Sequence, residues 1–145
     1  MKKVIFLSLF FLIVGNLSAS NDEELIKQTI TDAYVNGIQN AGSLEDIEKG
    51  FHPSFVLIGM GKDGYTVWEN PIYTWKERVR QYKEKNPENS KPPVRCKFDF
   101  VDITGNACVA KISLYREDKK IFTDYLSLYK FENGWRIVSK IFHRH

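Results

Sequence analysis

The feature that most constrains this chain is a change of hydrophobic period at Val94. From there to the C-terminus, apolar residues alternate with polar ones through four runs, at 94–100, 108–114, 121–131 and 135–142. A period of two sends successive side chains to opposite faces of a strand, so each run predicts a strand with one buried face. The C-terminal part of the chain is therefore expected to form an antiparallel sheet.

Before Val94 the apolar residues recur at close to 3.6-residue spacing in three segments, which predicts helices. These helices are expected over 21–39, after an N-cap at Ser43, and after Asn70 with Pro71 in its first turn. Pro53 is expected to break the second helix, and two short strands are expected at 55–58 and 65–68. The order α-α-β-β-α-β-β-β-β predicts an α+β fold, in which an antiparallel sheet packs against three N-terminal and mid-chain helices.

The turn after the third predicted strand decides whether the two cysteines can meet. A three-residue turn at 104–106 pairs Cys96 with Leu114 and places the apolar sets of both strands on one face. A two-residue turn at Gly105-Asn106 would place them on opposite faces, so the longer turn is preferred. Cys96 and Cys108 then lie roughly 20 Å apart along the ladder, whereas a disulfide needs α-carbons within about 7 Å. Both thiols are expected to be free.

The N-terminus has the three parts of a secretory signal peptide. Lys2 and Lys3 precede an apolar run over 4–14, and small residues follow at 18–20. The run is well short of the ~20 residues that span a bilayer. We therefore expect a signal peptide over 1–20, cleavage near Ser20, a periplasmic or secreted mature protein, and no stable membrane anchor.

The mature segment, 21–145, has the length of one domain. Of the 21 basic residues in the chain, two lie in the leader, so 19 remain against 18 acidic residues. The charges alternate in sign and form no basic stripe, so nucleic acid is not expected as a partner. No cofactor is expected either.

Four stretches of the mature segment resemble the putative lumazine-binding family, within the nuclear transport factor 2-like superfamily of cystatin-like fold. They are Tyr34–Gly37 (YVNG), Phe51-His52-Pro53, Asp124–Leu128 and Gly134–Lys140. The resemblance implies a cone-shaped, strongly curved sheet, a ligand pocket between helices and sheet, and frequent dimerisation. We expect a homodimer through the sheet face. It does not imply that lumazine is the ligand.

His52, Asp124 and His143 are the candidate catalytic residues. His52 precedes a proline where a helix is expected to end, so it either caps that helix or serves as an acid or base. If Asn133-Gly134 forms the last turn, Asp124 lies opposite His143, and the pair could be a general base or a solvated ion pair. Members of the superfamily with ketosteroid isomerase activity carry an aspartate near the end of the first strand, but 57–60 contains no acid.

Aromatic residues make up 14% of the chain, enough to line an apolar pocket as well as fill a core. The candidate ligand-binding residues are Tyr34, Trp68, Trp75, Phe98, Tyr125 and Phe142. His143 and His145 could offer two metal ligands, but a catalytic zinc site usually has three, so no metal is expected.

These observations favour a secreted or periplasmic domain that binds a small molecule, with no catalysis assigned. The alternatives are a cofactor-free isomerase, dehydratase or cyclase acting in the pocket, and a dimeric scaffold. A pocket lined by a desolvated acid or base would favour the enzyme, and one lined by aromatic rings would favour binding.

The N-terminal pattern gives a first prediction about export. Mass spectrometry of the native protein should find a chain that starts within about two residues of Asn21. Recovery of the intact chain from Met1 in the membrane fraction would contradict it.

Overall fold

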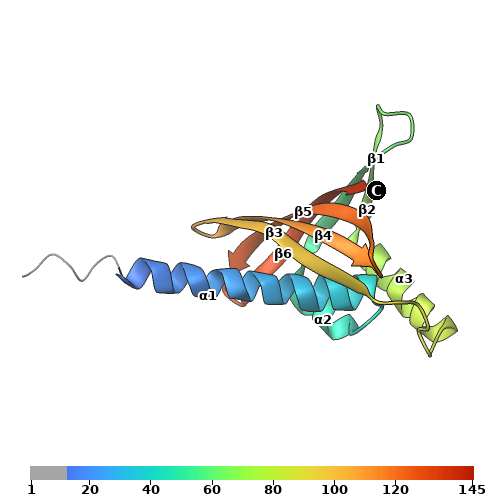
Figure 1. The fold of residues 1–145 in the computed structure, drawn as a ribbon, viewed down its shortest axis with the longest axis horizontal. Coiled ribbons are helices and arrows are strands. Elements are labelled where there is room, and N and C mark those ends of the chain that lie inside the picture. The colour runs from blue at the N-terminus through green and yellow to red at the C-terminus, as the bar shows by residue number, and fades with distance from the viewer. Residues whose placement is uncertain (1–12) are drawn as a thin grey trace, which may run out of the picture.

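The computed structural model describes residues 13–145, and their side chains from Asn21 onward. Figure 1 shows the helices gathered on one side of a curved sheet, with the β1–β2 hairpin projecting away from the rest. The elements are α1 (Ile13–Thr29), η1 (Ile30–Gln39), α2 (Leu44–Gly50), β1 (Phe51–Met60), β2 (Val67–Pro71), α3 (Ile72–Lys85), β3 (Val94–Thr104), β4 (Ala107–Arg116), β5 (Lys119–Phe131) and β6 (Gly134–Arg144).

The predicted leader falls partly outside the described residues. Residues 1–12 are not described, and 13–20 belong to the first turns of α1. Within 13–145, no helix is long and apolar enough to cross a membrane. Export therefore stays a prediction.

The predicted α+β class and element order are confirmed. The six strands lie in the order β2-β1-β6-β5-β4-β3, and all neighbours are antiparallel except β1 and β6, which run parallel. The core lies between the sheet and the helices, where buried residues of α1 and η1 such as Ile26 and Ile30 join Leu114 and Leu126 of the sheet in one cluster.

The first predicted helix continues as a π-helix through its last ten residues, η1. A π-helix carries more residues per turn than an α-helix. Such segments are rare in proteins overall, but those that occur are often found at functional sites. The spacing of apolar residues predicted a helix here but could not distinguish the two kinds. Tyr34 lies in the middle of this segment and is fully buried.

Two predicted helix ends were wrong by a few residues. The Ser43 cap is confirmed, because its hydroxyl accepts a hydrogen bond from the Asp46 N–H at 3.1 Å. However, α2 ends at Gly50, before Pro53 is reached, and β1 begins at once. At α3 the N-cap is Pro71, and Asn70 belongs to β2.

The β3–β4 turn differs from the predicted one, although the predicted pairing further along is confirmed. Thr104 pairs with Ala107, which makes the two-residue turn that the sequence argument rejected. A bulge between Phe98 and Phe100 then shifts the register by one, so Cys96 still lies opposite Leu114. Cys108 lies opposite Ile103, and both cysteines are free, as predicted.

The β5–β6 register contradicts the predicted pairing of Asp124 with His143. Phe131 pairs with Gly134, so the two-residue turn is Glu132-Asn133, one residue before the predicted Asn133-Gly134, and the pairing shifts by two residues. A bulge on β6, between the pairs at Ser127 and Leu128, reduces this shift by one residue, so the observed pairing still differs from the predicted one by one residue. Asp124 therefore lies opposite Phe142, and His143 lies opposite Thr123 on the other face of the sheet.

Candidate functional site

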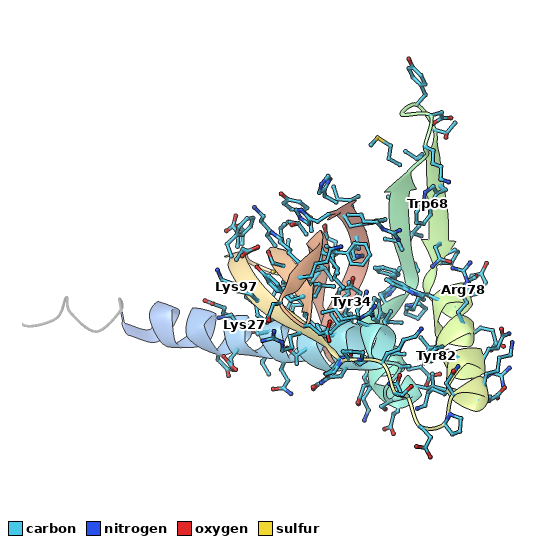
Figure 2. All side chains as sticks on the ribbon, turned by 45° about the vertical axis from the view of Figure 1, so that its right-hand side comes forward. Lys27, Tyr34, Trp68, Arg78, Tyr82 and Lys97 are labelled. Carbon is cyan, nitrogen blue, oxygen red and sulfur yellow. The ribbon has the colours of Figure 1, made fainter. Side chains whose placement is uncertain are left out.

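A buried polar network lies between the sheet and η1. It consists of Asp124 from β5, Lys140 from β6 and Tyr34 from η1, with Gln39 at its edge. The side chains of Asp124 and Tyr34 are fully buried, and Lys140 is 4% exposed. Figure 2 shows Tyr34 where the helix layer meets the sheet.

The sheet register places the two charges together. Asp124 pairs with Phe142 and Leu126 pairs with Lys140, so Asp124 and Lys140 are diagonal neighbours on the inward face. The Lys140 Nζ lies 2.7 Å from Asp124 Oδ1. This contact is an ion pair, since no donor among the described residues is aligned with Oδ1 as a hydrogen bond.

The Tyr34 hydroxyl uses its full hydrogen-bonding capacity. It donates to Asp124 Oδ2 at 2.6 Å and accepts from Lys140 Nζ at 2.7 Å and from Gln39 Nε2 at 2.8 Å. A phenol has one donor and two acceptor lone pairs, so nothing is left unsatisfied. The pattern is that of a neutral phenol held between a carboxylate and an ammonium.

Four aromatic rings surround the Lys140 ammonium. Its Nζ lies 4.9 Å from the ring centroids of Tyr34 and Phe142, and 5.9 Å from those of Trp75 and Phe122. The negative faces of such rings attract a cation, and the attraction grows when water is excluded. The rings therefore complete a site that holds the cation away from solvent.

Burial shifts the pKa values of Tyr34 and Lys140 in opposite directions. It raises the pKa of Tyr34 well above its usual range, and the neighbouring Asp124 charge acts in the same direction. Burial lowers the pKa of Lys140, while Asp124 opposes that shift through its charge and contact. Tyr34 is therefore neutral, and the positive charge of Lys140 depends on the Asp124 carboxylate beside it.

A pocket of about 220 Å³ opens beside this network, and we call it the α3 pocket. It lies among the end of η1, α3, the segment 86–93 and the end of β4, and it shares Gln39 and Trp75 with the network. Figure 2 shows two of its residues, Arg78 and Tyr82, on α3. The other polar residues of its lining are Asn89, Lys91 and Arg116, and the rest are apolar.

The loop that forms one wall of the α3 pocket is fixed by hydrogen bonds. Tyr82 donates to Asn89 Oδ1 at 3.2 Å, and Asn89 Nδ2 donates to the Asn40 carbonyl at 2.8 Å. Asn40 in turn bonds both backbone groups of Val94. The wall is thus anchored to the helix layer and to the start of β3.

A second pocket, of about 330 Å³, lies among α2, β1 and α3. Its two charged lining residues, Glu48 and Lys76, form an ion pair with each other. Its charges therefore already have partners, which leaves the α3 pocket as the better candidate site.

The structure separates the predicted catalytic residues. Asp124 is buried in the network, whereas His143 is exposed on the opposite sheet face. His52 does not cap α2, because its ring bonds the Ser54 hydroxyl at 2.6 Å and stacks on Phe131. The carbonyls of Glu48 and Phe51, at the end of α2, instead accept hydrogen bonds from Arg136.

The six predicted ligand-binding aromatics also divide. Tyr34 and Phe142 surround Lys140, and Trp75 lies between Lys140 and the α3 pocket. Phe98 packs against the core. The remaining two are partly exposed: Trp68 lies on the β1–β2 hairpin above Gly59, and Tyr125 is on the outer sheet face.

Sequence reasoning missed Lys140, Gln39 and Arg116. Lysine is rarely buried, so the alternation over 135–142 gave no reason to place Lys140 inward. One signal was available, because Lys140 and Asp124 each end or begin a stretch that carries the family resemblance. Nothing in the sequence brought Arg116 near Gln39.

The comparisons with known proteins agree on the fold. The model of the family described as putative lumazine-binding matches residues 21–143. An NTF2-like protein of unknown function from Shewanella baltica is 24% identical, covers 87% of this chain and 95% of its own, and gives a TM-score of 0.68. An NTF2-like protein with a cystatin-like fold from Novosphingobium aromaticivorans is 12% identical, covers 94% and 92%, and gives a TM-score of 0.65. The resemblance found in the sequence is confirmed.

A curated relative is an aldolase, FrzH, from a Cladobotryum species. It is 26% identical over 111 residues, which are 76% of this chain and 82% of the relative. An identity of 26% does not show that this chain shares the activity of that relative.

The network gives a prediction about stability. Lys140→Met should lower the free energy of unfolding by about 3–5 kcal/mol, because it leaves the Asp124 carboxylate buried without a cation. In the double variant Lys140→Met/Asp124→Leu, much of the loss should be recovered. Denaturant unfolding of the three proteins measures both effects.

The matched control is Lys130→Met, which removes a partly exposed ion pair with Asp22. Its cost should stay below about 1 kcal/mol. Equal losses at Lys130 and Lys140 would show that the buried pair is no more important than a surface pair.

Proposed function

This chain belongs to the putative lumazine-binding family, and from that premise we propose that it binds a small planar organic molecule in the α3 pocket. The observation that carries the proposal is the lining of this pocket. The aromatic side chains of Trp75 and Tyr82 line it together with the amide of Gln39. Rings that give contact area and a few polar groups that fix orientation are the usual composition of a small-molecule site.

Binding is favoured over catalysis because the buried acid and base do not line this pocket. Asp124, Lys140 and Tyr34 bond one another, and the pocket meets them only through Gln39 and Trp75. We propose that the network holds Gln39 and Trp75, which line the pocket, in fixed positions. The proposal extends to export of the mature domain, which the start of the family match at Asn21 supports.

The proposal is tested by titration with lumazine and a panel of small aromatic and carboxylate metabolites, followed by tryptophan fluorescence. A ligand in the α3 pocket should quench Trp75 saturably, so Trp75→Phe should abolish the change while Trp68→Phe retains it. Tyr82→Ala should weaken binding by about three- to tenfold through lost ring contact. If no compound causes a saturable change in the folded protein, the proposal is wrong.

A second candidate function is cofactor-free catalysis on a carbonyl compound. It is favoured by the relative named as an aldolase and by the lowered pKa of Lys140, since a desolvated lysine is a common nucleophile. Mass spectrometry of the same incubations would detect product. Turnover that Lys140→Gln abolishes would favour this alternative.

We also propose a homodimer through the outer face of the sheet. Phe100, Lys111, Tyr125 and Ile141 lie opposite one another across β3, β4, β5 and β6. Three of them are exposed large hydrophobic residues, and Ile141 is 54% exposed. An apolar row of this kind on one face is typical of an interaction surface.

Ile141→Glu should convert the dimer to a monomer, because a carboxylate would be buried at the interface without a partner. Light scattering after gel filtration measures the mass. Lys119→Glu, on an exposed strand end, is the control and should leave the mass unchanged. A wild-type monomer at high protein concentration would contradict the dimer.

A further inference from the structure

Three cationic side chains line the α3 pocket, and no acidic one does. The cations are Arg78, Lys91 and Arg116. From this charge and from the partners that these residues lack, we infer that the ligand of the α3 pocket is a planar organic carboxylate. The inference rests on the proposed function and gives it a substrate class.

The arginines of the chain differ in the partners that the protein gives them. Six arginines occur in the chain. Three of them, Arg80, Arg95 and Arg136, bond carboxylates, an amide or backbone carbonyls. Arg144 lies over the Phe122 ring.

The remaining two, Arg78 and Arg116, form no hydrogen bond or ion pair with the side chains or backbone described from Asn21 onward, and both line the α3 pocket. The Nε of Arg116 is also buried without an acceptor, which costs free energy unless a partner is supplied. The edge of a guanidinium presents parallel N–H groups that match the two oxygens of a carboxylate. A bound carboxylate would thus satisfy a donor that the protein leaves unpaired.

The walls of the pocket fit a flat apolar body behind that carboxylate. Trp75 and Tyr82 offer ring faces, and the Lys91 Nζ lies 4.8 Å from the Tyr82 ring centroid. The volume of about 220 Å³ is enough for one or two fused rings. The ligand class is therefore small, flat and anionic.

Backbone conformation also marks this pocket. Ala41 and Asn89 both line it, and both have positive φ, at 52° and 37°. Left-handed backbone at a residue with a β-carbon costs free energy and gathers at ligand sites, where the surrounding structure holds it. The hydrogen bonds of Asn89 with Tyr82 and Asn40 hold one of these two residues in place.

The test compares 2-naphthoate with its neutral counterpart 2-naphthamide by isothermal titration of the full mature chain. The two probes have the same ring and nearly the same shape, so their difference isolates the charge. We expect naphthoate to bind at least about tenfold more tightly, since a hydrogen bond to a charged group contributes about 1.5–3 kcal/mol. Arg116→Gln and Arg78→Gln should each weaken naphthoate by about fivefold or more and leave naphthamide unchanged.

Arg80→Gln is the matched control, because Arg80 lies on the same helix as Arg78 and is held by Glu77 and Glu84. It should change neither affinity. Equal binding of the two probes, or equal loss in the Arg80 and Arg116 variants, would overturn the inference. Inorganic phosphate that binds as tightly as naphthoate would also overturn it, because the rings would then contribute nothing.

Failure of the carboxylate inference can be separated from failure of the proposed function. If neither naphthalene probe binds but another compound quenches Trp75, the pocket is a binding site and only the ligand class is wrong. If nothing quenches Trp75, both are wrong.

Discussion

The ion pair between Lys140 and Asp124 is the interaction on which the arrangement of helices and sheet depends. The sheet supplies both charges, and burying them is costly unless every polar atom finds a partner. The helix layer supplies what is missing, because the Tyr34 hydroxyl donates to Asp124 and accepts from Lys140. The Tyr34 hydroxyl thereby joins η1 to both β5 and β6. The buried pair and the Tyr34 hydroxyl therefore form one polar connection between the two layers.

The π-helical form of η1 connects the buried network to the α3 pocket. Tyr34 and Gln39 are five residues apart, and Gln39 Nε2 reaches back to the Tyr34 hydroxyl. A π-helix brings residues five positions apart into register, which an α-helix does not. Gln39 can thus bond the buried network and line the α3 pocket at the same time. The pocket acquires a fixed edge, whereas its opposite wall is a loop anchored through Asn89.

The order of elements could be predicted because hydrophobic period follows directly from secondary structure. The free cysteines followed from the same pattern, although for a partly mistaken reason: a two-residue turn and a bulge near Asp99 together give the pairing that a longer turn would have given. The site could not be predicted in the same way. A one-residue bulge on β6 decides which face Asp124 shares with Phe142, and no residue type in the sequence marks that bulge. Arg116 and Gln39 meet only through tertiary packing.

The two sets of cations in this protein have opposite electrostatic roles. Asp124 neutralises Lys140 at 2.7 Å, so that pair has little net charge to act on its surroundings. Arg78 and Arg116 have no such partner among the described residues, so their charge acts on whatever enters the α3 pocket. Trp75 belongs to both regions, because its ring lies 5.9 Å from the Lys140 Nζ and also lines the α3 pocket. The binding of an anion that we propose for the α3 pocket therefore needs no contribution from Lys140, whose charge is used within the buried network.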